Sequence, residues 1–207
     1  MWVGDDESDE ATQVVAELAK VALAAAGVTA IGLVGTGVWL GLFYRPTPAA
    51  GNPFTPSGTT NDAVPLVDWV RFAHIWTARL FMVALLIVLA LAVIRVLLEA
   101  RPAMSAVLAG AACVLAGAGI ATGRLLAWDQ LALWAVTPGT ATTGYRPFFG
   151  DQTRWVIVGG AETEPSNVVV ALAAHAVLIP ALLLVVSFLA RLLKRSSSAP
   201  GGGGGGR

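Results

Sequence analysis

Three long stretches without a charged side chain constrain this sequence more than any other feature. They comprise the 24 residues between Lys20 and Arg45, the 22 between Arg101 and Arg124, and the 26 between Glu164 and Arg191. A helix needs about 20 apolar residues to cross a bilayer, because each residue rises about 1.5 Å and the hydrocarbon core is about 30 Å thick. Each stretch is therefore predicted to be a transmembrane helix.

A fourth apolar segment runs from Pro65 to Leu98 and is polar in its first half. Residues 80–94 carry no charge, whereas the residues before them include Asp68, Arg71, His74 and Arg79. A guanidinium that faces lipid at the depth of Arg79 is costly, so we expect Arg79 to face the interior. The sequence thus predicts an all-α membrane protein, a four-transmembrane-helix bundle in a multi-pass arrangement in the cell membrane.

The composition supports this class and excludes others. Charged residues make up 13% of the chain, whereas soluble domains carry about 25%. Thirteen basic and thirteen acidic residues cancel, so no basic field exists to hold nucleic acid. A single cysteine, Cys113, excludes an internal disulfide, and no Cys-x-x-Cys-His motif or Cys/His zinc set occurs. A metal in this chain must therefore be held by very few ligands.

The two ends of the chain are predicted to lie on one side of the membrane. Residues 1–19 form an acidic segment expected to be a flexible tail, residues 20–195 form the transmembrane domain, and residues 196–207 form a flexible Ser/Gly-rich tail. An even number of helices puts both termini together. That side holds seven basic residues against three on the other: Lys20, Arg95, Arg101, Arg191, Lys194, Arg195 and Arg207, against Arg45, Arg146 and Arg154. The excess predicts that both termini are cytoplasmic.

The only two histidines, His74 and His175, are predicted to lie at one depth. Proline is tolerated at the first position of a helix, so Pro65 and Pro165 are expected to open the second and fourth helices from the outer side. The histidines follow these prolines by nine and ten residues, which places each roughly 14 to 15 Å along its helix.

Two interpretations of the histidines remain open at this point. Two imidazoles on facing helices of a bundle can supply both axial ligands of a haem iron, and the macrocycle then buries its apolar faces between the helices. Alternatively, the two histidines are unrelated, and each is hydrogen-bonded to a backbone carbonyl. An ionisable residue in a membrane helix is by default a candidate for function.

Glycines and arginines near the histidines fit the first interpretation. Gly37 and Gly123 fall near the outer ends of the first and third helices and would let a flat ring approach closely, although glycine stripes also serve helix packing. Arg71, Arg79 and Arg124 are candidate partners for the two haem propionates. Their alternative role is to snorkel to the membrane interface.

Five fragments in this order resemble the N-terminal, haem-binding half of cytochrome b from quinol-oxidising bc-type complexes, in its split form. The fragments are Thr36–Pro46, Arg71–His74 with Ala78, Thr122–Gln130, Trp155 with Gly159 and Gly160, and His175–Pro180. The resemblance covers roughly residues 20–195 and implies that His74 and His175 ligate haem b.

The resemblance also implies a function and partners. It implies an electron-transfer subunit of a respiratory complex, an enzyme only together with other subunits, with quinol as donor and quinone as product. The expected partners are membrane lipid, a C-terminal cytochrome b-type subunit, and an iron-sulfur or cytochrome c protein, within an oligomeric complex.

The chain departs from this family where a second haem would be held. The family resembled carries a second histidine about fourteen residues after each of the first pair, and the corresponding positions here are Val88, Leu189 and Ala190. Its second pair of glycines corresponds to Leu23 and Ala109. We therefore expect one haem, near the outer face, and an inner pocket filled by side chains.

Two alternatives from other functional classes are kept. In one, the chain is a haem-free structural subunit descended from cytochrome b. In the other, it is a quinone- or lipid-binding subunit in which Arg79 and Arg124 hold a polar head group. The retained histidines weigh against both, because a haem-free bundle gains by replacing a buried imidazole with an apolar group.

Overall fold

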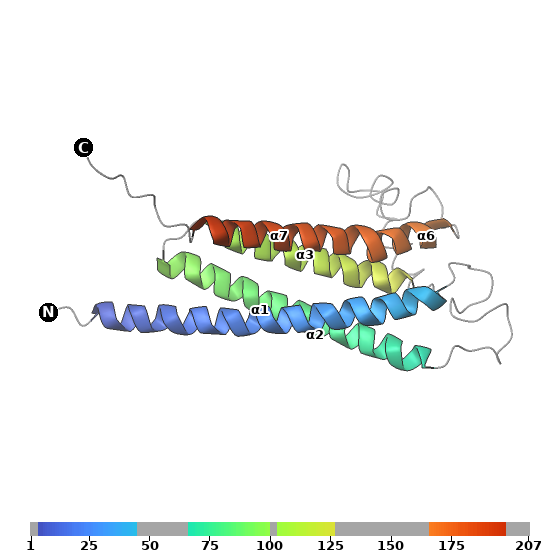
Figure 1. Cartoon of the computed structure of the whole chain (residues 1–207), viewed down its shortest axis with the longest axis horizontal. Helices are drawn as coiled ribbons and strands as arrows, with labels where there is room; N and C mark the ends of the chain where they lie inside the picture. Colours follow the sequence, from blue (N-terminus) through green and yellow to red (C-terminus); the bar gives the residue numbers. More distant parts are fainter. Residues whose placement is uncertain (1–3, 45–65, 100–102, 127–165, 198–207) are drawn as a thin grey trace, which may run out of the picture.

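The computed structural model describes residues 4–44, 66–99, 103–126 and 166–197, and this part of the chain is almost entirely helical (Figure 1). The helices are α1 (Gly4–Phe43), α2 (Val67–Glu99), α3 (Met104–Leu125), α6 (Ser166–Ala173) and α7 (Ile179–Ser197). A π-helical turn, η2 (Ala174–Leu178), joins α6 to α7. We refer to α6, η2 and α7 together as the fourth helix.

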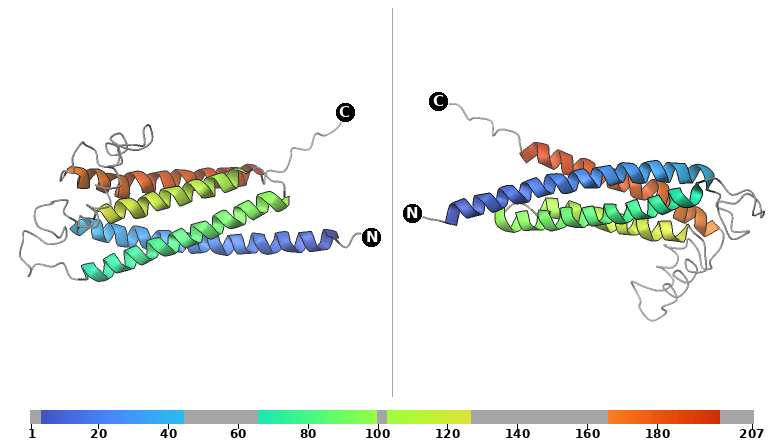
Figure 2. Two further views of the ribbon diagram at one scale, coloured as in Figure 1. Left: turned by 180° about the vertical axis from the view of Figure 1, so that it is seen from behind. Right: turned by 90° about the horizontal axis from the view of Figure 1, so that it is seen from below.

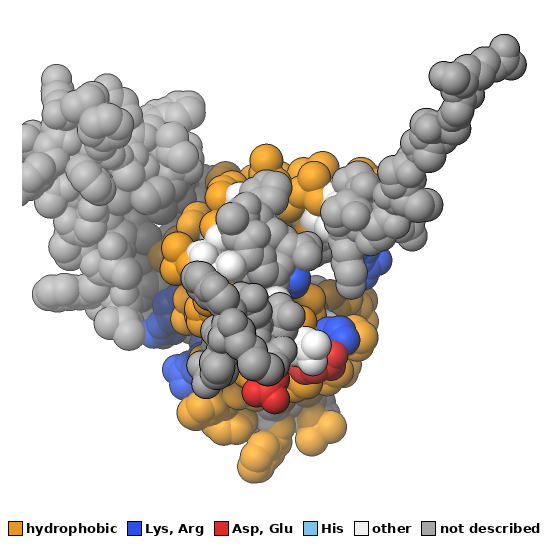
Figure 3. All heavy atoms as spheres, turned by 90° about the vertical axis from the view of Figure 1, so that its left-hand side faces the viewer, with side chains coloured by type: hydrophobic (Ala, Val, Ile, Leu, Met, Phe, Trp, Pro, Cys, Tyr) orange, Lys and Arg blue, Asp and Glu red, His pale blue; other side chains and the backbone are white. Residues whose placement is uncertain are grey.

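Within the described residues, four helices are long and apolar enough to cross a membrane. These spans are Glu10–Phe43, Val67–Leu98, Met104–Leu125 and Val169–Leu193. They confirm the predicted four-helix membrane fold. α1 begins and α7 ends at the same end of the bundle (Figure 1), which we call the terminal end, and the opposite end is called the outer end. Charged side chains gather on the terminal end and apolar ones surround the bundle there (Figure 3).

The helices pack in sequence along the chain. α1 contacts α2, α2 contacts α3, and α3 contacts all three parts of the fourth helix. Two further views show that α1 crosses α2 and that α3 runs beside the fourth helix (Figure 2). The chain therefore forms two helical hairpins that meet where α2 packs on α3.

Small side chains form the centre of the bundle. The core cluster is Ala26, Ala84, Leu85 and Ala116, with Phe81, Met82, Ala112 and Cys113 packed against it. Large apolar side chains mostly point outward; Ile31, for example, is 75% exposed. Helices in lipid gain little from burying large apolar groups and associate through close contacts between small residues, so this inside-out pattern is what a membrane bundle requires.

Two expectations about the ends and the inner half are corrected by the structure. α1 begins at Gly4, so most of the expected acidic tail is helical; its acidic residues lie near the helix N-terminus, where the helix dipole favours negative charge. Leu23 is 56% exposed, while its neighbours Ala22 and Ala26 are buried. Leu23 therefore does not fill an inner pocket, whereas Ala109 does face the interior.

Of the three other positions that correspond to second-haem ligands in the family resembled, one is half-buried and two are exposed. Val88 is half-buried. Leu189 and Ala190 are exposed on the fourth helix, away from the core cluster. Of the predicted Ser/Gly-rich tail, Ser196 and Ser197 end α7, and residues 198–207 lie outside the described part of the chain.

Candidate functional site

The two histidines meet near the outer end of the bundle. The centroids of the His74 and His175 rings lie 6.1 Å apart, and the ring planes make an angle of 69°. His74 comes from α2 and His175 from η2, so each helical hairpin contributes one imidazole. Both side chains are half-buried.

This separation fits a metal ion between the rings. An imidazole nitrogen binds a metal at about 2 Å, so two rings on opposite sides of one ion have centroids about 6 Å apart. The observed 6.1 Å agrees with that distance. Haem iron needs only two ligands from the protein, because the macrocycle supplies the others.

A threonine hydroxyl fixes the protonation of the His74 ring. Thr36 Oγ1 lies 2.9 Å from His74 Nδ1, and the same hydroxyl donates to the carbonyl of Gly32 at 2.7 Å. A hydroxyl has one hydrogen to donate. With that hydrogen on the carbonyl of Gly32, the hydroxyl accepts from Nδ1–H. The lone pair of the ring is then on Nε2, the nitrogen left for a metal.

The same arrangement recurs at His175. Its Nδ1 lies 2.9 Å from the carbonyl oxygen of Gly119 and 3.2 Å from Thr122 Oγ1. A carbonyl can only accept, so Nδ1 carries the hydrogen and Nε2 the lone pair. Thr122 donates to the carbonyl of Ala118 at 2.8 Å, just as Thr36 donates to the carbonyl of Gly32 on α1. Both rings therefore present the nitrogen that a metal would need.

A glycine follows each threonine and makes room for the neighbouring histidine. A Cβ atom at position 37 would lie 3.2 Å from His74 Cε1, and one at position 123 would lie 2.7 Å from His175 Cε1. The first contact is tight and the second is a collision. The sequence Thr-Gly on α1 and on α3 thus serves one histidine each, through a hydrogen bond and a cleared space.

Comparison with known proteins agrees with this geometry. The family model described as Cytochrome b/b6/petB matches residues 14–197. The chain belongs to the cytochrome b family. No curated protein matches it at significant similarity. Membership makes the chain a haem-binding, electron-transfer subunit, embedded in the membrane as part of a redox complex.

The three arginines of this cytochrome b-family chain occupy different environments. Arg71 is half-buried and close enough to Tyr44 for its charge to act on the phenol. Arg124 is exposed in the last turn of α3, next to Gly123. Arg79 is exposed and its guanidinium lies 4.7 Å from the centre of the Trp76 ring. The expectation that Arg79 faces the interior is therefore wrong.

Two features of this cytochrome b site were not predicted from the sequence. The first is the pair of threonines, although each stands directly before a glycine of the site. The second is the π-helical turn that carries His175, in which the N–H of Ile179 bonds the carbonyl of Ala174. Pro180 follows directly and cannot donate to a carbonyl in the preceding turn, which commonly distorts a helix. A proline five residues after His175 was the available signal.

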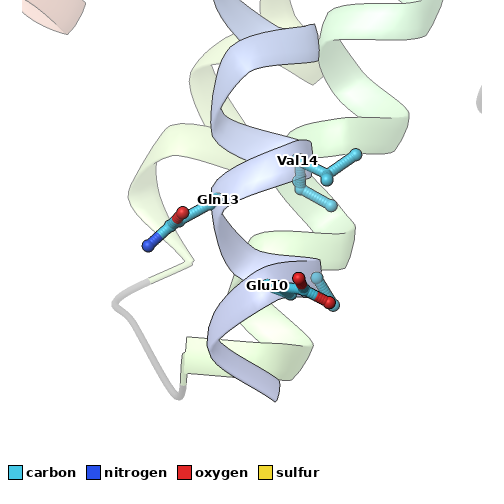
Figure 4. Close-up of a pocket in the computed structure, with 5 residues that line it drawn as sticks. Glu10, Gln13 and Val14 are labelled. Atoms are coloured by element: carbon cyan, nitrogen blue, oxygen red, sulfur yellow. The ribbon is translucent and has the colours of Figure 1, made fainter. Parts of the chain in front are cut away.

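A shallow hollow at the other end of α1 is unrelated to this site. It is lined by residues of one helix alone, among them Glu10, Gln13 and Val14 (Figure 4). A ligand needs groups that converge from several elements, so the hollow is not a candidate binding site.

Proposed function

We propose that this chain holds one haem b between His74 and His175, near the outer face, and transfers electrons within a quinol-oxidising complex. The observation that supports this most is the histidine pair, with ring centroids 6.1 Å apart and with both Nδ1 atoms engaged by the protein. When bound, haem supplies a reversible one-electron couple at its iron.

The chain's own residues are proposed to bind and orient this group. His74 and His175 are the axial ligands, and Thr36, Thr122 and the Gly119 carbonyl fix their tautomers. Hydrogen bonds of this kind to a ligating histidine also raise its basicity. Gly37 and Gly123, whose missing side chains already make room for the imidazoles, are proposed to allow the ring to approach the helices.

Two of the three arginines are proposed as partners of the haem propionates. Arg71 lies on α2 one turn outward of His74, and Arg124 follows Gly123 on α3. A guanidinium binds a carboxylate through two parallel hydrogen bonds. Arg79 was a third candidate, but its exposed position over Trp76 favours the alternative in which it snorkels toward the outer membrane interface.

A single haem is proposed because the chain has no second pair of ligands. Val88, Leu189 and Ala190 stand where the family resembled has histidine, and the last two are exposed. The alanine-rich core cluster occupies the bundle between the histidine pair and the terminal end. An electron on the outer haem therefore has no second carrier in this chain for crossing the membrane.

The proposed setting is a respiratory complex of the cell membrane with the chain termini in the cytoplasm. The donor is a quinol, oxidised at a site shared with other subunits, which include a C-terminal cytochrome b-type subunit and an iron-sulfur or cytochrome c partner. The start of α1 and the end of α7 lie at one end of the bundle, which is compatible with this orientation.

A haem-free structural or quinone-binding subunit is the second candidate. One observation favours it: both Nδ1 atoms already have hydrogen-bond partners within the chain, so neither histidine is an unsatisfied buried group. A haem-free subunit does not explain why the two imidazole rings face each other.

Haem content and ligation decide between the two. We expect the full chain, purified from a haem-replete host, to contain about one haem per polypeptide by pyridine haemochrome assay, with the low-spin spectrum of two imidazole ligands. Replacing His74 or His175 with Ala should abolish that spectrum. A chain without haem under these conditions, or with two haems, contradicts the proposal.

A further inference from the structure

Tyr44, directly after α1, bridges α1 and α3, two helices that both pack on α2. Its hydroxyl donates a 2.9 Å hydrogen bond to the carbonyl oxygen of Leu126, directly after α3. α1 packs along α2, whereas α3 packs along α2 and the fourth helix. The bond therefore joins the first hairpin to the second at the outer end of the bundle.

The acceptor is a carbonyl that the helix itself leaves available. Leu126 is the C-cap of α3, and its own N–H bonds the carbonyl of Thr122. The last carbonyls of a helix have no donor within the helix. Tyr44 satisfies one of them, which ties its phenol to a fixed point of the α3 backbone.

The hydrogen bond from Tyr44 to Leu126, which we call the tie, lies just outward of the histidine site on both helices. Tyr44 follows Gly37 by seven residues, and Leu126 follows Gly123 by three. The two Thr-Gly pairs that contact His74 and His175 are thus carried by the two helices that the tie joins. Separation of α1 from α3 at the outer end would move the two sides of the site apart.

The phenol is able to donate at any physiological pH. Burial raises the pKa of Tyr44 to about 12, and the positive charge of Arg71 opposes part of that rise. The tie therefore acts as a permanent contact rather than as a switch.

We propose that Tyr44 is a positioning residue whose hydrogen bond to Leu126 holds the outer ends of α1 and α3 together and thereby slows the loss of haem from the site between His74 and His175. This inference rests on the proposed haem site, and it assigns to Tyr44 no contact with the haem.

Tyr44→Phe tests the tie because it removes only the hydroxyl. We expect haem transfer from the full chain to an apomyoglobin acceptor to become about fivefold faster, the factor that an ordinary hydrogen bond is worth. The matched control is Thr29→Val, which removes a hydroxyl that bonds the carbonyl of Ala25 in its own helix at 2.8 Å. The control should leave the rate unchanged.

A second measurement reports the distance between α1 and α3 in the haem-free protein. Spin labels at Leu42→Cys and Ala121→Cys, both exposed positions, report the separation of α1 and α3 in a Cys113→Ser background. Tyr44→Phe should broaden the distance distribution of the haem-free protein, and Thr29→Val should not.

A short thiol cross-link between Tyr44→Cys and Leu126→Cys should restore slow haem loss, which a role of the phenol other than the tie would not predict. An unchanged haem-loss rate in Tyr44→Phe overturns the inference, whatever the spin labels report. A wild-type chain that takes up no haem instead contradicts the proposed function, and the spin-label distances then decide alone whether Tyr44 ties the two helices.

Discussion

Gly123 and His175 are so close that a single methyl group at position 123 would overlap the imidazole: its carbon would lie 2.7 Å from Cε1. The glycine is thus a requirement for the observed position of the histidine. At Gly37 the corresponding distance to His74 Cε1 is 3.2 Å, which a small shift of the ring relieves.

Alanine at these glycines should therefore have graded effects on haem binding. We expect Gly123→Ala to lose most of its haem, since overpacking of this kind costs about 1 to 3 kcal/mol and falls directly on a proposed axial ligand. Gly37→Ala should lose less. Gly35→Ala is the control, because a Cβ there meets nothing within 4 Å. Equal haem content in all three variants would contradict the cleared-space interpretation.

Removal of each threonine hydroxyl should change the haem potential unequally. His175 keeps its 2.9 Å bond to the Gly119 carbonyl when Thr122 becomes Val, whereas His74 loses its 2.9 Å bond when Thr36 becomes Val and keeps only a weaker contact with the backbone of Leu33. A weaker Nδ1–H bond makes the imidazole a poorer donor and disfavours the ferric state. We expect Thr36→Val to raise the midpoint potential by about 20 to 60 mV, and Thr122→Val to raise it less. Redox titration of both variants measures this, and the reverse order would refute it.

Arg71 and Arg79 should differ sharply when each is replaced with Leu. Arg71→Leu removes a half-buried cation one turn from His74 and should lower haem retention. Arg79→Leu removes an exposed cation that lies over Trp76 and should leave haem content and potential unchanged. A shifted potential in Arg79→Leu would return this residue to the haem site.

New histidines in the inner half should not create a second haem site. In Val88→His combined with Leu189→His or Ala190→His, the second imidazole would lie on an exposed face of the fourth helix, away from the core cluster. The imidazole at position 88 would be half-buried without a partner, which costs roughly 1 to 3 kcal/mol. We expect one haem per chain and a lower melting temperature, also after Ala109→Gly and Leu23→Gly are added. A second low-spin haem in the double mutant would show that only the ligands had been missing.

The contribution of Tyr44 to stability should depend on pH only in the alkaline range. Its pKa rises from 10.0 in the unfolded chain to about 12 in the folded one, so the protonated phenol favours the folded state. That stabilisation is complete below pH 10 and is lost as the pH rises toward 12. Unfolding of wild type and Tyr44→Phe from pH 7 to 11.5 measures it. A difference between the two proteins that is constant over this range would contradict it.

The sequence predicted the helices and the histidine pairing because both depend on distance along the chain. Charge-free runs fix where a helix can cross lipid, and the similar spacing of each histidine from a proline expected to open its helix predicts a common depth. Rotation about the helix axis was harder to infer. Arg79 follows His74 by five residues, which turns it by about 140° about the helix axis, and depth in the membrane carries no information on that angle.

Other features could not be predicted from spacing because they depend on contacts between helices. Leu23 lies fourteen residues before Gly37, nearly four full turns, yet it is exposed because the neighbouring Ala22 and Ala26 face the partner helices. The bond from Tyr44 to Leu126 joins residues 82 positions apart and requires the arrangement of α1 and α3. The Gly119 carbonyl becomes available to His175 through a similar long-range contact.

The division of the site between two hairpins has a consequence for biogenesis. α1 and α2 carry one Thr-Gly pair with one histidine, and α3 and the fourth helix carry the other. On the proposed function, a chain inserted hairpin by hairpin contains only half a ligand set until its last helix has docked. A haem ligated by one histidine from each hairpin would then hold the two hairpins together. Bound haem would therefore mark the chains that have finished folding, and these are the chains that cellular quality control should not degrade.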